Sequence, residues 1–65
     1  MAYLAVDIDG SEWIFDTKPV RSDRWRGSWR GGYHILLKEG DIEKLTGTRL
    51  TWDDEPIKYN SNDLT

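Results

Sequence analysis

The chain has 65 residues, a net charge of −3 and no cysteine, and it contains four tryptophans. A chain of this length forms one small domain and buries only about 60% of its extended surface. Its composition excludes a disulfide framework and a cysteine metal site, and no stretch approaches the roughly 18 apolar residues of a membrane span.

The first predicted element is a β-hairpin. Residues 2–8 are apolar and rich in strand formers, Asp9-Gly10 follows, and residues 12–16 form a second strand-like run. Two such runs joined by Asp-Gly favour a hairpin, because a type I′ turn needs positive φ at both central residues. Lys18-Pro19 is expected to end the second strand, since proline cannot donate a hydrogen bond to a sheet.

The start of this hairpin also resembles a catalytic motif. Residues 4–11 read LAVDIDGS, which is similar to the opening motif of the haloacid dehalogenase phosphatases. The resemblance would make Asp7 the nucleophile and Asp9 the acid/base. However, that family's parallel sheet needs crossover connections of a dozen or more residues, for which this chain has no room. A strand that leads into a tight turn accounts for the same residues. We therefore predict no catalytic residue, no cofactor and no metal site.

The next segment, residues 20–32, is predicted to be a long loop. It has no regular period and contains three Gly, two Trp and four Arg. Residues 19–34 carry a net charge of +3, whereas residues 1–18 carry −3. Arg and Trp are the residue types most enriched in binding hot spots. We therefore predict a partner-binding site made of Arg24, Trp25, Arg26, Trp29 and Arg30.

Two alternatives for this loop stay open. Trp25 and Trp29 are either contact residues or part of the core, with one in each role also possible, because a small chain has few other apolar side chains to bury. The predicted partner is an acidic region of a protein, which suits one basic patch on an acidic chain. Single-stranded DNA or RNA bound by the same loop is the alternative, since Arg and Trp also contact phosphates and stack on bases.

A short helix is predicted over residues 41–46. Asp41 is a residue type that caps helix N-termini, and Ile42 and Leu45 lie on one face. Gly47 occupies the position of a left-handed C-cap. The local pattern therefore specifies both ends of this helix.

The other elements of the C-terminal half are predicted to be strands. Residues 33–37 and 48–52 form a third and a fourth strand, a turn follows over residues 53–56, and residues 57–59 add a short edge strand. His34, the single histidine, is expected to be a surface or half-buried sheet residue. The order of elements predicts a β-rich α+β fold: a small antiparallel sheet of three to five strands with one helix, for which an SH3-like barrel is one arrangement.

The C-terminal half also resembles known sequences. Residues 38–57 read KEGDIEKLTGTRLTWDDEPI and are similar to the C-terminal half of small uncharacterised proteins encoded by bacteriophages and prophages. The resemblance implies a bacterial cytoplasm and interference with a host protein, and it carries no known functional residue.

These observations predict a single cytoplasmic domain over residues 1–60 and a frayed tail over residues 61–65. The N-terminal apolar run has no basic flank and no cleavage site, so we expect neither a secretory signal nor a membrane partner. The predicted function is a non-enzymatic binding module of phage type that contacts a protein through loop 21–33.

Overall fold

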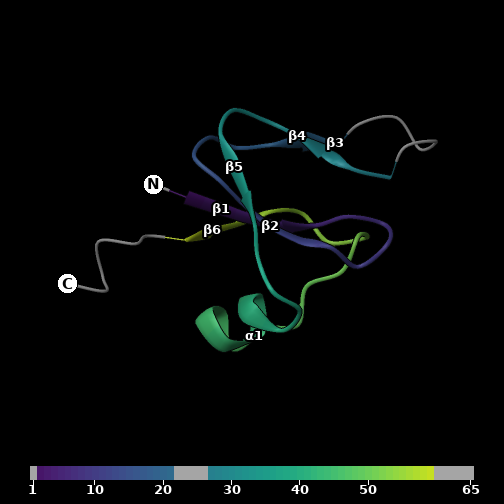
Figure 1. Cartoon of the computed structure of the whole chain (residues 1–65), viewed down its shortest axis with the longest axis vertical. Helices are drawn as coiled ribbons and strands as arrows, with labels where there is room; N and C mark the ends of the chain where they lie inside the picture. The colour runs from purple at the N-terminus through teal and green to yellow at the C-terminus, as the bar shows by residue number, and fades with distance from the viewer. Residues whose placement is uncertain (1, 22–26, 60–65) are drawn as a thin grey trace.

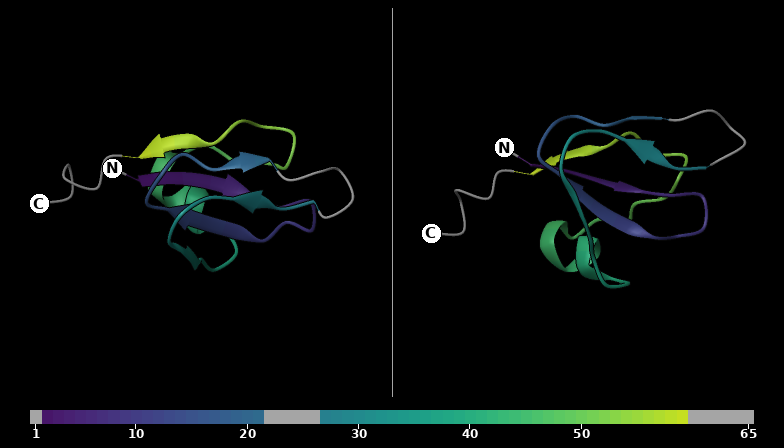
Figure 2. Two further views of the ribbon diagram at one scale, coloured as in Figure 1. Left: turned by 90° about the horizontal axis from the view of Figure 1, so that it is seen from above. Right: turned by 45° about the horizontal axis from the view of Figure 1, so that its top comes forward.

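Three layers make up the structure, a computed structural model that describes residues 2–21 and 27–59 (Figure 1). Its elements are β1 (Ala2–Val6), β2 (Glu12–Phe15), β3 (Val20–Arg21), β4 (Trp29–Arg30), β5 (His34–Leu36), α1 (Asp41–Thr46) and β6 (Ile57–Tyr59). The central layer is a four-stranded antiparallel sheet in the order β5-β2-β1-β6, and β3 and β4 form a second, two-stranded sheet. The small sheet lies over one face of the central sheet and α1 over the other (Figures 1 and 2). The predicted β-rich α+β fold is confirmed.

The predicted hairpin of β1 and β2 is confirmed, but its turn differs from the prediction. Val6 pairs with Glu12, and the Asp7 N–H donates to the Ser11 carbonyl at 2.9 Å, which leaves a three-residue loop. Gly10 has a φ of 91°, whereas no other residue type in the described ranges has a positive φ. The prediction of a type I′ turn at Asp9-Gly10 was therefore wrong, because that turn would need a positive φ at Asp9 as well.

Asp9 supports this loop from the solvent side. Its carboxylate accepts a hydrogen bond from the Ser11 backbone N–H at 2.9 Å. That hydrogen bond favours the charged form and lowers the pKa of the exposed Asp9 carboxyl. The residue acts as a local turn former, which is the role that the tight-turn interpretation gave it.

Alternating side chains of β1 build a core on each side of the central sheet. Leu4 and Val6 face α1 and pack with Ile42 and Leu50. Between them, Ala5 faces the small sheet, where the core consists of Ala5, Phe15 and Trp29. Because β1 is buried on both faces, its sequence is apolar almost without interruption.

The predicted loop over residues 20–32 contains a short hairpin. Strands β3 and β4 pair Val20 with Arg30 and Arg21 with Trp29. The prediction of an irregular loop was wrong at these positions, because two-residue strands are too short to show a period in the sequence. What holds them on the central sheet is the burial of Trp29, of which 8% is exposed.

Helix α1 has the predicted bounds and the predicted C-cap, but not the predicted N-cap. Gly47 has a φ of 75° and donates its N–H to the Glu43 carbonyl at 2.7 Å. At the other end the N-cap residue is Gly40, which provides no side-chain cap. Instead the Glu12 carboxylate accepts from the N–H groups of Gly40 at 2.7 Å and Ile42 at 2.9 Å. The prediction of Asp41 as N-cap was wrong because a side chain from β2 takes this role.

Residues 48–52 are not a strand, contrary to prediction. The place beside β1 is taken by β6, which pairs Leu4 with Ile57. Leu50 is instead buried on the helix side of the sheet, whereas Trp52 packs against the core that lies under the small sheet. A turn follows over residues 51–54, two positions before the predicted turn of residues 53–56, with the Asp54 N–H donating to the Thr51 carbonyl at 3.0 Å.

The predicted edge strand over residues 57–59 is confirmed as β6, and the predicted third strand is confirmed as β5. His34 is an exposed sheet residue, with its ring against Trp13 and Phe15. Within the described residues the strands form two separate sheets, so they do not close into an SH3-like barrel. The predicted tail over residues 61–65 lies outside the described residues.

Candidate functional site

The predicted Arg/Trp site is not assembled as one surface within the described residues. Arg24, Trp25 and Arg26 lie outside them. Trp29 is buried, and its indole N–H donates to the Val6 carbonyl at 2.9 Å. Arg30 is exposed on β4. Trp29 therefore takes the core role that was the alternative to contact, and its side chain offers little surface to a partner.

Arg21, at the start of the same loop, contacts the protein's own aromatic residues. Its guanidinium lies 4.6 Å from the ring centre of Trp29 and 4.9 Å from that of Trp52. It also donates to the Trp52 carbonyl at 2.8 Å and lies 3.8 Å from the Glu55 carboxylate. This arrangement joins β3 to residues 52–55, which are more than thirty positions away in the chain.

Replacing Arg21 by Ala should destabilise the fold by about 1–2 kcal/mol, because partly exposed cation–π contacts contribute roughly 0.5–1 kcal/mol each. Arg21→Lys should recover less than half of that loss, since a compact ammonium group lacks the planar surface with which a guanidinium contacts two rings. Urea unfolding followed by tryptophan fluorescence measures both effects. Lys18→Ala, at an exposed site, is the control and should be neutral. Full recovery in the lysine variant would show that charge alone matters.

Asp7, the first acid of the phosphatase-like motif, has a structural role. Its carboxylate accepts from the indole N–H of Trp13 at 2.8 Å and from the backbone N–H of Trp29 at 3.2 Å. Both oxygens are thus engaged in holding the hairpin and β4 together. In the described parts of the chain, no group of three or more His, Cys, Asp and Glu residues is placed to hold a metal ion.

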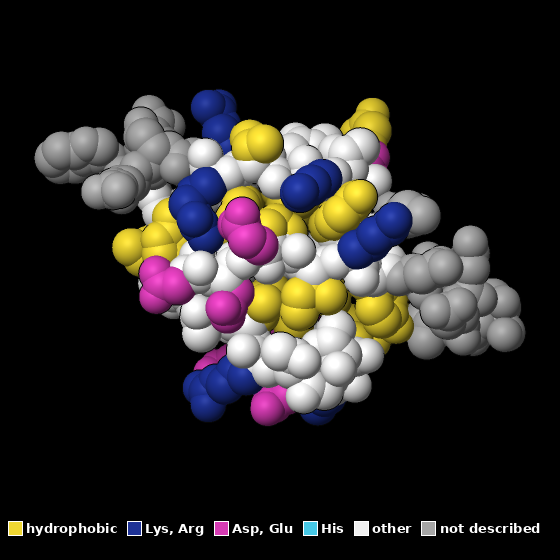
Figure 3. All heavy atoms as spheres, turned by 180° about the vertical axis from the view of Figure 1, so that it is seen from behind, with side chains coloured by type: hydrophobic (Ala, Val, Ile, Leu, Met, Phe, Trp, Pro, Cys, Tyr) yellow, Lys and Arg dark blue, Asp and Glu magenta, His cyan; other side chains and the backbone are white. Residues whose placement is uncertain are grey.

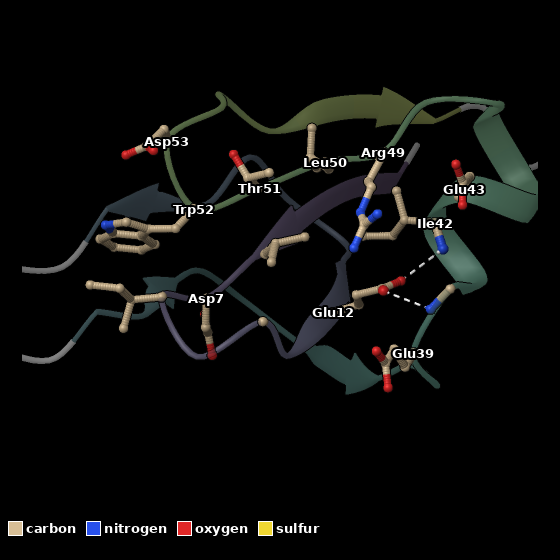
Figure 4. A pocket seen from close by; sticks show the side chains of 14 residues that line it. Asp7, Glu12, Glu39, Ile42, Glu43, Arg49, Leu50, Thr51, Trp52 and Asp53 are labelled. Carbon is tan, nitrogen blue, oxygen red and sulfur yellow. Dashed lines mark hydrogen bonds between the residues drawn. The ribbon is translucent and has the colours of Figure 1, made fainter.

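A groove of about 710 Å³ lies on the helix side of the central sheet (Figure 4). Its walls are the end of β1 with the hairpin loop, the start of α1 with the residues before it, and the segment of residues 49–53. The buried side chains of Val6, Ile42 and Leu50 contribute its apolar surface. The groove exists because residues 48–52 cross the sheet here without pairing with it.

Charged side chains surround this apolar floor. Glu39, Glu43 and Asp53 are exposed at the groove, and within the described residues none of these carboxylates makes a hydrogen bond or an ion pair. Arg49 extends from the opposite wall toward Glu12, as Figure 4 shows. Glu12 itself is occupied with the backbone of α1. The lining side chains carry five negative charges and one positive charge, so the groove favours a cationic ligand.

Trp52 closes one end of the groove, where an apolar group of a ligand would meet it. Its ring also packs edge-on against Trp29, with the ring centres 5.6 Å apart. The face opposite to that of Figure 1 shows apolar side chains exposed between acidic and basic ones (Figure 3). A groove of this composition fits a segment that alternates apolar and basic groups better than it fits a small neutral molecule.

No short motif in the sequence predicts this groove, because its residues come from three separate segments of the chain. Glu39 precedes α1, Glu43 lies within it, and Asp53 belongs to a turn. The described helix, α1, is too short to cross a membrane. Comparisons with protein-family models, curated proteins and solved structures gave no match for this chain.

Proposed function

We propose that this protein is a non-enzymatic binding module whose groove takes a basic, partly apolar segment of a protein partner. This proposal rests on one observation: the groove combines an apolar floor with three carboxylates that have no partner within the described residues. Opposite charge steers and orients such an encounter, while the floor provides apolar contact area.

A binding role is supported by how the polar groups around the groove are used. Acid–base or nucleophilic catalysis needs groups that are free to exchange protons and that face a common reacting atom. Glu12 is committed to the backbone of α1 and Asp7 to two tryptophans, and the groove lining, in the part of the chain that the structure describes, places no His, Cys, Ser or Lys beside its three unpartnered carboxylates. His34 lies in β5, which does not line the groove.

The proposed surface differs from loop 21–33. A contact through Arg24, Trp25 and Arg26 stays a prediction, because these residues lie outside the described ranges. A cytoplasmic location and a host or phage protein as partner are likewise proposals, which the resemblance of residues 38–57 to phage-encoded proteins supports. Single-stranded nucleic acid is disfavoured at the groove, since its phosphates would meet carboxylates.

Three probes test this function: a short peptide in which lysine alternates with leucine, its counterpart with glutamate for lysine, and an oligothymidylate. The lysine peptide should shift the amide signals of residues 39–43 and 49–53 and the indole signal of Trp52. Glu39→Gln combined with Glu43→Gln should weaken its binding about fivefold, since two exposed charge pairs contribute roughly 1 kcal/mol together.

The matched control combines Asp16→Asn with Glu55→Gln, which removes two negative charges away from the groove. It should leave the affinity within about twofold, because long-range effects of exposed charges are screened by salt. Equal weakening in both double variants would reject the groove as the site. Binding of the oligothymidylate, lost on adding salt, would replace this proposal by the nucleic-acid alternative.

A further inference from the structure

The outer edge of the central sheet at β5 carries exposed apolar side chains. Tyr33 is 87% exposed, Ile35 68% and Leu36 57%. Strand β5 pairs with β2 on one side, and within the described residues no strand pairs with its other side. Such an edge is a template for another strand.

The other edge of the same sheet looks different. Strand β6 follows Pro56 and carries Lys58 at its centre. Proline and lysine are the residues with which proteins block pairing at a sheet edge. Strand β5 has neither, so only one of the two edges is protected against pairing.

The hydrogen bonds between β5 and β2 show which backbone groups of β5 are open. The Leu37 N–H donates to the Glu12 carbonyl at 2.8 Å, and the Asp16 N–H donates to the Tyr33 carbonyl at 3.0 Å. Because hydrogen bonding alternates along an antiparallel strand, Tyr33, Ile35 and Leu37 direct their backbone groups to β2. His34 and Leu36 therefore direct theirs outward.

The open stretch ends on both sides. Before it, the Gly32 N–H donates to the Thr17 hydroxyl at 3.1 Å. After it, the Lys38 N–H donates to the Asp41 carboxylate at 3.0 Å and the Lys38 carbonyl accepts from Asp41. Only His34 and Leu36 are left to pair, which restricts the register of any incoming strand.

We propose that this edge binds β5 of a second copy of the chain in antiparallel register. His34 of each copy pairs with Leu36 of the other, which satisfies all four open N–H and C=O groups of each strand. Ile35 then lies on the two-fold axis opposite Ile35 of the second copy. This register is self-complementary, as a two-fold interface must be. The inference is independent of the groove, because residues 33–37 do not line it.

Charge also favours a second copy. At a two-fold axis each residue meets its own counterpart, so a charged residue near the axis would repel itself. Residues 33–37 contain no Asp, Glu, Lys or Arg, although the chain is rich in charge elsewhere. Two chains of net charge −3 can therefore approach each other along this neutral strand.

The proposed pairing buries the exposed apolar residues on both faces of the sheet. On the helix face, Tyr33 lies beside Leu37 of the second copy, on either side of the Ile35 pair. The two four-stranded sheets become one eight-stranded sheet with both copies of α1 on the same face. An edge this short buries little area, so we expect a weak dimer that depends on concentration.

Sedimentation velocity and amide hydrogen exchange, each over a range of protein concentrations, test the proposal. The sedimentation coefficient should rise from monomer to dimer. The N–H groups of His34 and Leu36 should gain protection with concentration, whereas those of Ile35 and Leu37 should be protected throughout by β2. A monomer at all concentrations, with His34 and Leu36 unprotected, would overturn the proposal.

Two matched variants locate the interface. Ile35→Lys places like charges face to face and should weaken the dimer about tenfold or more. Val20→Lys makes the same change at a similarly exposed apolar residue, 65% exposed on β3, and should change the dissociation constant less than about twofold. An equimolar mixture of Ile35→Lys and Ile35→Glu chains should form a heterodimer, because opposite charges then meet at the axis.

A dimer that survives Ile35→Lys, or that Val20→Lys abolishes equally, would place the interface elsewhere. Failure of the Lys and Glu variants to associate would exclude the two-fold register. A chain that stays monomeric but captures an added strand-forming peptide at β5 would show that the edge serves a foreign strand. Circular dichroism checks that each variant keeps its fold.

Discussion

Trp29→Ala should remove a large part of the protein's stability at 25 °C. Removing a buried Trp costs about 3–5 kcal/mol, and a chain of 65 residues has only about 3–10 kcal/mol of stability at roughly 0.05–0.15 kcal/mol per residue. Trp29 fills the core against Ala5 and Phe15 and also satisfies the Val6 carbonyl. Urea unfolding and near-ultraviolet circular dichroism measure the loss.

Two further variants separate the contributions of this side chain. Trp29→Phe keeps an aromatic ring but leaves the Val6 carbonyl without its donor, so it should cost about 1–3 kcal/mol. Val20→Ala changes an exposed residue of the same small sheet and should stay within about 0.5 kcal/mol of the parent. A stable Trp29→Ala variant that loses only partner binding would instead support the contact role.

The second large effect is expected at Glu12. Glu12→Ala should destabilise the protein by about 2–3 kcal/mol, because the N–H groups of Gly40 and Ile42 lose a charged acceptor. Helix α1 has six residues and is too short to persist without tertiary support. In Glu12→Ala the amide protons of α1 should therefore gain more in exchange rate than those of β1, which hydrogen exchange monitored by NMR can resolve.

Glu12→Gln tests whether the charge matters in addition to the hydrogen bonds. The amide keeps one oxygen acceptor but points an NH₂ donor at the second N–H group, so about half of the loss should remain. Glu39→Ala is the control, since its exposed carboxylate has no partner in the described residues and its loss should be nearly neutral. Equal effects at Glu12 and Glu39 would contradict the capping role.

The roles of Trp29 and Glu12 could not be predicted from the residues that surround them in the sequence. Trp29 is one of two tryptophans in an Arg-rich segment, and its neighbouring residues are compatible with a contact surface as well as with a core position. Its burial depends on the space above Ala5 and Phe15, which exists only once β1 and β2 have paired. Glu12 caps a helix that begins 29 positions later in the chain, so no local motif could reveal it.

The candidate groove could likewise be predicted only in part from the sequence. Its apolar floor was foreseeable as core, since Val6, Ile42 and Leu50 are apolar residues within predicted elements. That a groove opens above them depends on residues 48–52 remaining outside the sheet. Strand propensity at Leu50 and Trp52 pointed the other way, and it was overridden because β6 occupies the position next to β1.

What the sequence by itself determined is the set of locally encoded elements. Asp9-Gly10 between apolar runs specified a hairpin, and the apolar pair before Gly47 specified α1 and its C-terminal end. Tertiary structure alone decided which tryptophan is buried, which carboxylate caps α1, how Arg21 packs between two rings, and which edge of the sheet stays open. The physical reason is distance along the chain. Turns and C-caps depend on a few neighbouring backbone angles, whereas these contacts join residues 23 to 31 positions apart and form only when the layers pack.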